Sequence, residues 1–135
     1  MQYRSIFRPG LFDGQTIVVT GGGSGLGRCT AHELKSLGAR LALIGRTAEK
    51  LEQVKRELGD ADTFTYVADL RQEDQVERAI DGVLAWAGRI DGLVNSAYFH
   101  PPWCSLEQAD IEDMKRAYDV NALGGLRMAQ AVMPQ

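Results

Sequence analysis

Apolar and polar residues follow two different periods in alternating segments of the chain. Short apolar runs such as Ile17-Val18-Val19 and Leu41-Ala42-Leu43-Ile44 show no polar alternation, which is typical of strands buried on both faces of a sheet. Predicted strands occupy about residues 16–20, 41–44, 64–68 and a short stretch centred on Leu93 and Val94. Elsewhere apolar residues recur at helical spacing. Predicted helices occupy about residues 25–37, 48–58, 73–87, 106–118 and 122–133.

The first predicted helix has a row of positions that indicates its packed face. Leu26, Thr30, Leu34 and Leu37 are spaced 4, 4 and 3 residues apart, so we expect this row to face the core. Gly38 follows at the position where a left-handed residue commonly ends a helix.

The alternation of strands with helices predicts an α/β fold. Strand–helix–strand units of this kind are right-handed and build parallel sheets covered by helices on both faces. We expect a Rossmann-type doubly wound parallel sheet in the order 3-2-1-4, truncated after about four strands and their helices. Its ligand should lie at the carboxyl ends of strands 1 and 4. Residues 1–13 are expected to form an irregular lead-in and residues 14–135 an incomplete domain.

Composition and charge exclude several classes of protein. The 135 residues carry a net charge of -3 with no block of like charges, which argues against nucleic acid or an anionic membrane as the main partner. No apolar stretch reaches the roughly 20 residues that span a bilayer, and residues 1–10 lack the apolar centre of a signal peptide. Two cysteines make neither a disulfide framework nor a metal site. We therefore expect a cytoplasmic protein without a metal.

A glycine-rich turn joins the first predicted strand to the first predicted helix. It has the form T-G-x-x-x-G-x-G, with Thr20, Gly21, Gly25 and Gly27 at the named positions. Gly21 permits a tight exit from the strand, Gly25 lets the backbone approach a pyrophosphate, and Gly27 lets the helix pack close to the sheet. Free amides and the positive end of the helix dipole then favour a phosphate. A strict G-x-G-x-x-G and a Walker A loop are both absent, and the alternative is a merely flexible glycine loop.

The end of the second predicted strand indicates which dinucleotide is preferred. An acidic residue at this place holds the ribose 2′-hydroxyl of NAD, whereas an arginine accommodates the 2′-phosphate of NADP. The sequence here is Ile44-Gly45-Arg46-Thr47, with no carboxylate. Arg46 can form a charge-assisted pair with a phosphate, and the hydroxyls of Ser24 and Thr47 can add contacts. We predict NADP(H) as the cofactor, with NAD as the alternative if Arg46 is only a surface residue.

These motifs resemble the short-chain dehydrogenase/reductase family over about residues 12–134. Asp69-Leu70 resembles the family's aspartate beside the adenine ring, and Asn95-Ser96-Ala97 resembles its Asn-Asn-Ala-Gly element. Asp119-Val120-Asn121 resembles the segment that carries its structural and catalytic asparagine. The lead-in Pro9-Gly10-Leu11-Phe12-Asp13-Gly14-Gln15 is similar to the branch that contains citronellol dehydrogenases and peroxisomal enoyl-CoA reductases.

The motifs and the resemblance together define the expected site. Asn121 is the one catalytic candidate, and no metal ligand is expected. The expected cofactor-binding residues are Thr20, Gly21, Ser24, Gly25, Leu26, Gly27, Arg46, Asp69, Leu70, Asn95 and Ala97.

The family's general acid/base, a tyrosine with a lysine four residues later, has no counterpart in this sequence. Tyr3, Tyr66, Tyr98 and Tyr118 are followed at that spacing by Phe7, Leu70, Pro102 and Ala122. The resemblance implies an NADP(H)-dependent oxidoreductase acting on a carbonyl/alcohol or enoyl-CoA substrate, with this chain supplying the cofactor-binding half and inactive alone. The alternative is a nucleotide-binding module or pseudoenzyme without turnover. A methyltransferase-like Rossmann domain is a third reading, which the Asp69 and Asn95 elements oppose.

The fourth strand would be an exposed sheet edge in such a half-domain. We therefore expect a homo-oligomer or a complementing chain, with a small molecule as the substrate. Tyr98 stands where the family has glycine, so it either stacks on the cofactor or intrudes on its site. The aromatic and proline-rich segment 98–104 either lines the substrate side of the cleft or packs on the sheet edge.

Overall fold

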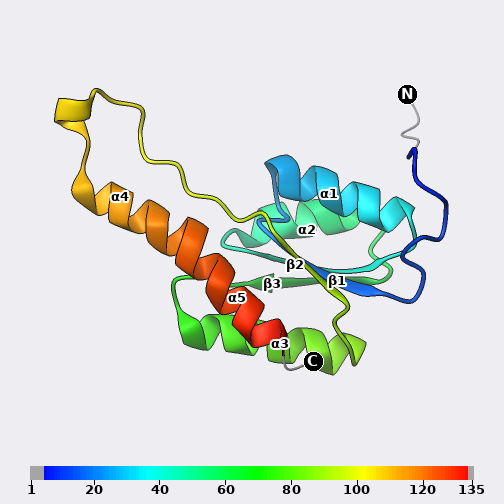
Figure 1. Ribbon diagram of the computed structural model, residues 1–135. Coiled ribbons are helices and arrows are strands. Elements are labelled where there is room, and N and C mark those ends of the chain that lie inside the picture. Colours follow the sequence, from blue (N-terminus) through cyan, green and yellow to red (C-terminus); the bar gives the residue numbers. More distant parts are fainter. Residues whose placement is uncertain (1–4, 134–135) are drawn as a thin grey trace.

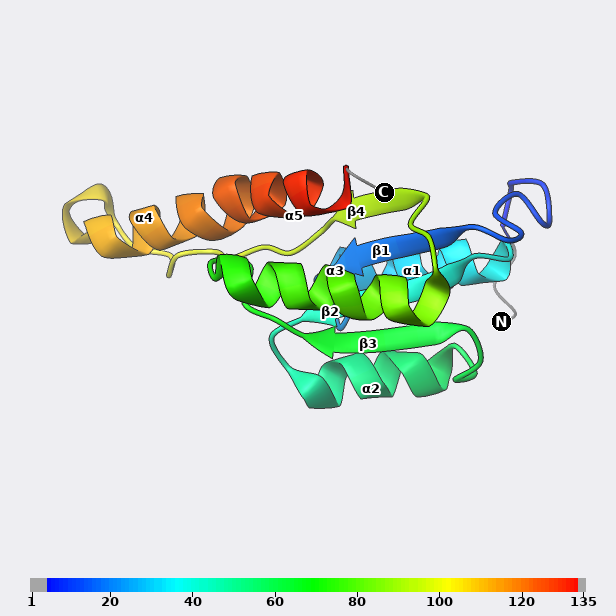
Figure 2. The ribbon, with the colours of Figure 1, turned by 90° about the horizontal axis from the view of Figure 1, so that it is seen from below.

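Strand β1 (Thr16–Thr20) is an interior strand of the sheet, and all five of its residues are buried. The computed structural model describes residues 5–133, and in it β1 pairs in parallel with β2 (Arg40–Gly45) and with β4 (Gly92–Asn95). Strand β3 (Thr63–Val67) pairs in parallel with the other side of β2. The order is therefore β3-β2-β1-β4, which confirms the predicted topology. All four carboxyl ends meet at one edge of the sheet (Figure 2).

Helices cover both faces of the sheet (Figure 1). Helices α1 (Gly25–Ser36) and α2 (Ala48–Glu57) pack on the face that presents Ile17 and Val19. Helices α3 (Glu73–Ala87) and α5 (Gly124–Val132) pack on the opposite face, where Val18 and Met128 are fully buried. The alternation of neighbouring β1 residues between two cores explains why the strand is apolar throughout.

The packed face of α1 is confirmed in part. Leu34 and Leu37 of the predicted row are buried and Thr30 is half-buried, but Leu26 is 81% exposed. Gly27, next to Leu26, is the residue that packs against the backbone of the glycine turn, and Leu26 lines the pocket at the carboxyl end of the sheet. The predicted left-handed residue at Gly38 is confirmed, with φ +96°.

The segment after β4 also differs from the prediction. Instead of one helix over residues 106–118, a short 3-10 turn (Leu106–Gln108) precedes α4 (Ile111–Tyr118). Asp110 has extended backbone angles, and its carboxylate caps α4 by accepting a hydrogen bond from the Glu112 amide at 2.8 Å. A π-helical turn (Asp119–Leu123) then joins α4 directly to α5, so the predicted break at this point is absent. Helix α4 extends beyond the end of the sheet (Figures 1 and 2).

Residues 5–133 contain neither a membrane-spanning helix nor a cluster of metal ligands. No helix there has both the length and the apolar character needed to cross a bilayer. No group of three or more metal-ligating side chains occurs in the same range.

Candidate nucleotide-binding site

A pocket of about 420 Å³ lies at the carboxyl ends of the strands. Its lining comes from five segments that are distant in sequence: the glycine turn after β1, the β2–α2 junction, the end of β3, the segment after β4, and the π-helical turn. Of the residues predicted to bind a cofactor, eight line this pocket. They are Gly21, Ser24, Gly25, Leu26, Arg46, Asp69, Leu70 and Ala97.

The three glycines at the named positions of the T-G-x-x-x-G-x-G motif differ in what surrounds them. A Cβ on Gly27 would lie 2.3 Å from the Gly21 carbonyl oxygen, and a Cβ on Gly21 would lie 2.7 Å from the Ser96 carbonyl oxygen. Both positions therefore need glycine for close backbone packing. Gly25 has φ +53° and no heavy atom within 4 Å of a built Cβ. Its bare backbone faces open space at the N-terminus of α1, where helix amides lack helical partners.

Thr20 lies behind the lining and holds two connections together. Its side chain is buried, and its hydroxyl oxygen accepts hydrogen bonds from the Ser96 and Ala97 amides at 3.1 Å each. Asn95 also faces away from the pocket lining, because its side-chain amide donates to the Gly125 carbonyl at 3.2 Å. Neither of these residues, nor Gly27, lines the pocket. In this structure the three hold the surrounding backbone in place.

The β2–α2 junction places positive charge at the rim. Arg46 is exposed and lines the pocket, as does Lys50 one turn later on α2. Within residues 5–133, no carboxylate forms an ion pair with either side chain. Thr47 is the N-cap residue of α2, but its side chain makes no capping hydrogen bond. The hydroxyl of Thr47 and the first amides of α2 are thus available beside two cations.

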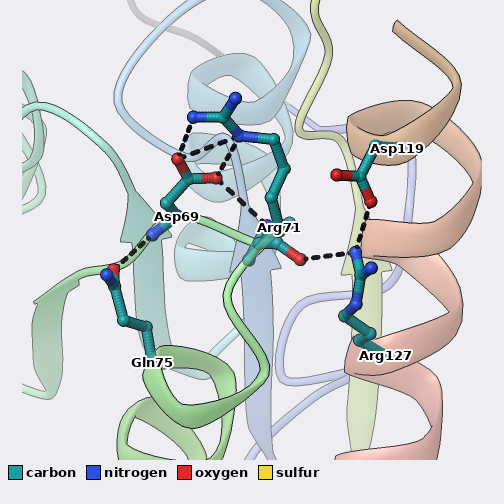
Figure 3. A network of polar contacts seen from close by, with 6 residues as sticks. Asp69, Arg71, Gln75, Asp119 and Arg127 are labelled. Atoms are coloured by element: carbon teal, nitrogen blue, oxygen red, sulfur yellow. Dashed lines mark hydrogen bonds and ion pairs between the residues drawn. The ribbon is translucent and has the colours of Figure 1, made fainter. Parts of the chain in front are cut away.

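Asp69, at the end of β3, is held by Arg71 (Figure 3). The Arg71 Nε and backbone amide each donate to Asp69 Oδ1 at 3.0 Å. Hydrogen bonding from the Arg71 side chain is the main reason that the pKa of Asp69 is lowered; burial opposes the change, and the hydrogen bond from the Arg71 amide adds to the lowering. The Asp69 amide in turn donates to Gln75 Oε1 at 2.9 Å. Asp69 is therefore an oriented carboxylate, and the sequence reasoning missed Arg71 although it lies only two residues away.

Asn121 lies in the π-helical turn and is paired with a backbone segment. Its Oδ1 accepts from the Phe99 amide at 2.8 Å, and its Nδ2 donates to the Phe99 carbonyl at 2.9 Å. Asn121 does not line the pocket, but its neighbour Val120 does. The catalytic role of Asn121 remains a prediction.

Tyr98 lines the pocket with its side chain 67% exposed. The segment that follows does not bury its largest side chain on the sheet edge, because Trp103 is 91% exposed. The Trp103 ring lies instead against the His100 ring, with 4.3 Å between the ring centroids. Of the two alternatives for this segment, packing on the sheet edge is thus wrong for Trp103.

A model of the short chain dehydrogenase family matches residues 15–135. The chain belongs to this family. Since the matched region contains every element of the pocket, the predicted family resemblance is confirmed. Short chain dehydrogenases are oxidoreductases, which agrees with a pocket at the carboxyl ends of a parallel sheet.

Individual short chain dehydrogenases show how much of the fold is present. Citronellol catabolism dehydrogenase of Pseudomonas aeruginosa is 45% identical with a TM-score of 0.88, covering 98% of this chain and 55% of that one. Arabidopsis thaliana 11-beta-hydroxysteroid dehydrogenase 1A is 33% identical, covering 98% of this chain and 38% of that protein. An Escherichia coli short chain dehydrogenase solved with NADPH is 25% identical with a TM-score of 0.85, covering 93% and 54%. The chain thus spans about half the length of these solved relatives.

Proposed function

We propose that this short chain dehydrogenase binds NADP(H) and is the cofactor-binding half of an oxidoreductase that interconverts a carbonyl and an alcohol. The observation that carries the cofactor assignment is the β2–α2 rim. Arg46 lines the pocket there without a carboxylate partner among the described residues, and the nearby Asp69 is already paired with Arg71. A ribose 2′-phosphate is the cofactor group that such a rim would favour.

The remaining lining residues suit the rest of a dinucleotide. Open backbone at Gly25 and the N-terminus of α1 would hold the pyrophosphate. Ser24 and Thr47 offer hydroxyls on the phosphate side, while Asp69 and Leu70 would contact the adenine. Ala97 and Tyr98 would lie along the other wall of the pocket. When bound, the cofactor supplies or accepts hydride, and this chain's residues orient it.

The names of two relatives support the proposed substrate class. A hydroxysteroid dehydrogenase and a citronellol catabolism dehydrogenase are both named for alcohols, which favours a carbonyl/alcohol pair over the enoyl-CoA alternative. The sequence has no tyrosine followed four residues later by lysine. We therefore propose that proton transfer to the substrate oxygen needs residues from another segment or chain, and that these 135 residues alone bind cofactor without turnover. Strand β4, which pairs only with β1 among the described strands, is the edge at which such a segment would add.

Calorimetric titration of NADPH and NADH into the chain and two variants tests the cofactor assignment. Arg46→Ala should weaken NADPH binding about 10- to 100-fold, since a charge-assisted hydrogen bond contributes about 1.5–3 kcal/mol. NADH binding should hardly change. Arg78→Ala is the matched control, because Arg78 forms an exposed pair with Asp74 on α3, outside the pocket lining. Tighter binding of NADH than NADPH by the unmodified chain, or equal losses for both cofactors in Arg46→Ala, would overturn the assignment.

A further inference from the structure

The π-helical turn between α4 and α5 is attached to the pocket on two sides. Val120, in the middle of the turn, lines the pocket and is only 6% exposed. On one side Asn121 is hydrogen-bonded to the backbone of Phe99, which directly follows the pocket residue Tyr98. On the other side the hydrogen bonds of the Arg127 side chain make the polar attachment.

Arg127 joins the turn to the end of β3 (Figure 3). Its Nη1 donates to the Leu70 carbonyl at 3.1 Å and to Asp119 Oδ1 at 2.8 Å. Leu70 lines the pocket and is 5% exposed. The start of α5 lies close to the same residue, since a Cβ on Gly124 would be 3.0 Å from Leu70 Cβ. Arg127 therefore bridges the pocket and the helix where the two are already in close contact.

The spacing of Asp119 and Arg127 makes their ion pair specific for the π-helical turn. Residues eight apart in an unbroken α-helix are rotated by about 80° from each other, at about 100° per residue. A π turn accommodates one extra residue, so the two side chains behave as if seven apart, about 20° from alignment. The pair can thus form on one face of the helix only while the extra residue remains in the turn.

We propose that Arg127 is a positioning residue, which stabilises the π-helical turn by holding the Leu70 carbonyl and the Asp119 carboxylate together and thereby sets Asn121 relative to the nucleotide pocket. The inference rests on the proposed function only for the identity of the pocket's ligand. The geometry of the turn itself can be tested without any ligand. A ligand in the pocket would contact Leu70 and Val120, and these contacts would change the surroundings of the Asn121 side chain.

Hydrogen exchange measured by NMR on the ligand-free chain is the first test. In Arg127→Gln, the Phe99 amide should exchange about tenfold faster, because the Asn121 acceptor is no longer held in place; tenfold corresponds to about 1.4 kcal/mol. Amides in β1 and β2 should keep their protection, and Arg78→Gln should behave like the unmodified chain. Unchanged exchange at Phe99, or an equal loss of protection throughout the sheet, would overturn the positioning role.

A second variant and a ligand titration complete the design. Asp119→Asn leaves the Leu70 bond possible and removes the ion pair, so it should give the same selective change at Phe99 even if Arg127→Gln fails to fold. NADPH should shift the Asn121 side-chain amide resonances in the unmodified chain, and this shift should be lost in Arg127→Gln although NADPH still binds. An equal shift in both proteins would contradict the proposal. Failure of the unmodified chain to bind NADPH would instead reject the proposed cofactor, and the ligand-free exchange would still decide the role of Arg127.

Discussion

Two threonines at opposite ends of β1 provide a matched test of the site's architecture. Thr16 and Thr20 are both buried, with 0% and 1% of the residue exposed. The Thr20 hydroxyl oxygen accepts from the amides of Ser96 and Ala97. The Thr16 hydroxyl has no hydrogen-bond partner among the described residues. Substitution by valine keeps the shape of each side chain and removes only the hydroxyl, so the two variants should differ in sign.

The hydrogen bonds set the expected magnitudes. Thr20→Val leaves two partly buried amides without an acceptor, and each such loss costs about 1–3 kcal/mol. Because both amides are only partly buried, we expect a total loss of about 2–4 kcal/mol in the free energy of unfolding. Thr16→Val removes a buried hydroxyl that makes no hydrogen bond, which by itself is unfavourable by about 1–3 kcal/mol. We expect this variant to be neutral or more stable by about 1 kcal/mol.

Urea unfolding followed by far-ultraviolet circular dichroism measures both values with the linear extrapolation. Ser96 and Ala97 line the pocket, so Thr20→Val should also weaken NADPH binding, whereas Thr16→Val should leave it unchanged. If Thr20→Val costs no more than Thr16→Val, the Thr20 hydroxyl does not hold the β4 exit. The account of this residue as part of the pocket's support would then be wrong.

Two further predictions use the same assays. Gly27→Ala places a Cβ 2.3 Å from a backbone oxygen and should lower the free energy of unfolding by about 3 kcal/mol. Gly25→Ala, at φ +53°, should lower it by only about 1 kcal/mol, yet it should weaken NADPH binding more than this loss of stability suggests. Equal losses of stability in the two variants would contradict this prediction. Hydrogen bonds from Arg89, and then from the Thr16 amide, lower the pKa of Asp91. A lowered pKa means stability that is present above the unfolded value of about 3.9 and lost as pH falls through the folded value. Asp91→Asn should therefore flatten the fall in unfolding free energy below about pH 5, and parallel acid limbs would refute it.

The sheet and its ligand edge could be predicted because their causes are local in sequence. Unalternated apolar runs such as Ile17-Val18-Val19 identify strands, and the alternation with helices fixes a parallel topology. The glycine turn was assigned from spacing alone, and its packing reasons appear in the structure at Gly21 and Gly27. The order of the strands followed from the same rules, and β4 lies at the edge of the sheet as expected.

The features that sequence reasoning missed depend on contacts between distant elements. Leu26 is exposed at the start of α1, where its neighbour Gly27 is the residue that approaches the turn backbone. The π-helical turn has no signature of its own in the apolar spacing, since it inserts one residue into an otherwise continuous helix. Arg127 acquires its partners only when α5 packs beside the end of β3. An i,i+8 pair of opposite charges, Asp119 and Arg127, is the sequence signal that could have indicated the turn.

The pairing of the arginines around the pocket supports the proposal that Arg46 determines the cofactor preference. Breaking a solvent-accessible ion pair costs up to about 1 kcal/mol, and a phosphate that recruits a paired arginine loses that much binding free energy. Three arginines of the surrounding elements are already in such ion pairs: Arg71 with Asp69, Arg127 with Asp119, and Arg28 with Glu57. Arg46, by contrast, has no carboxylate partner in residues 5–133 and lines the pocket. A 2′-phosphate can therefore pair with Arg46, and with the neighbouring Lys50, without breaking an ion pair between described residues, which supports the proposal that this rim favours NADP(H).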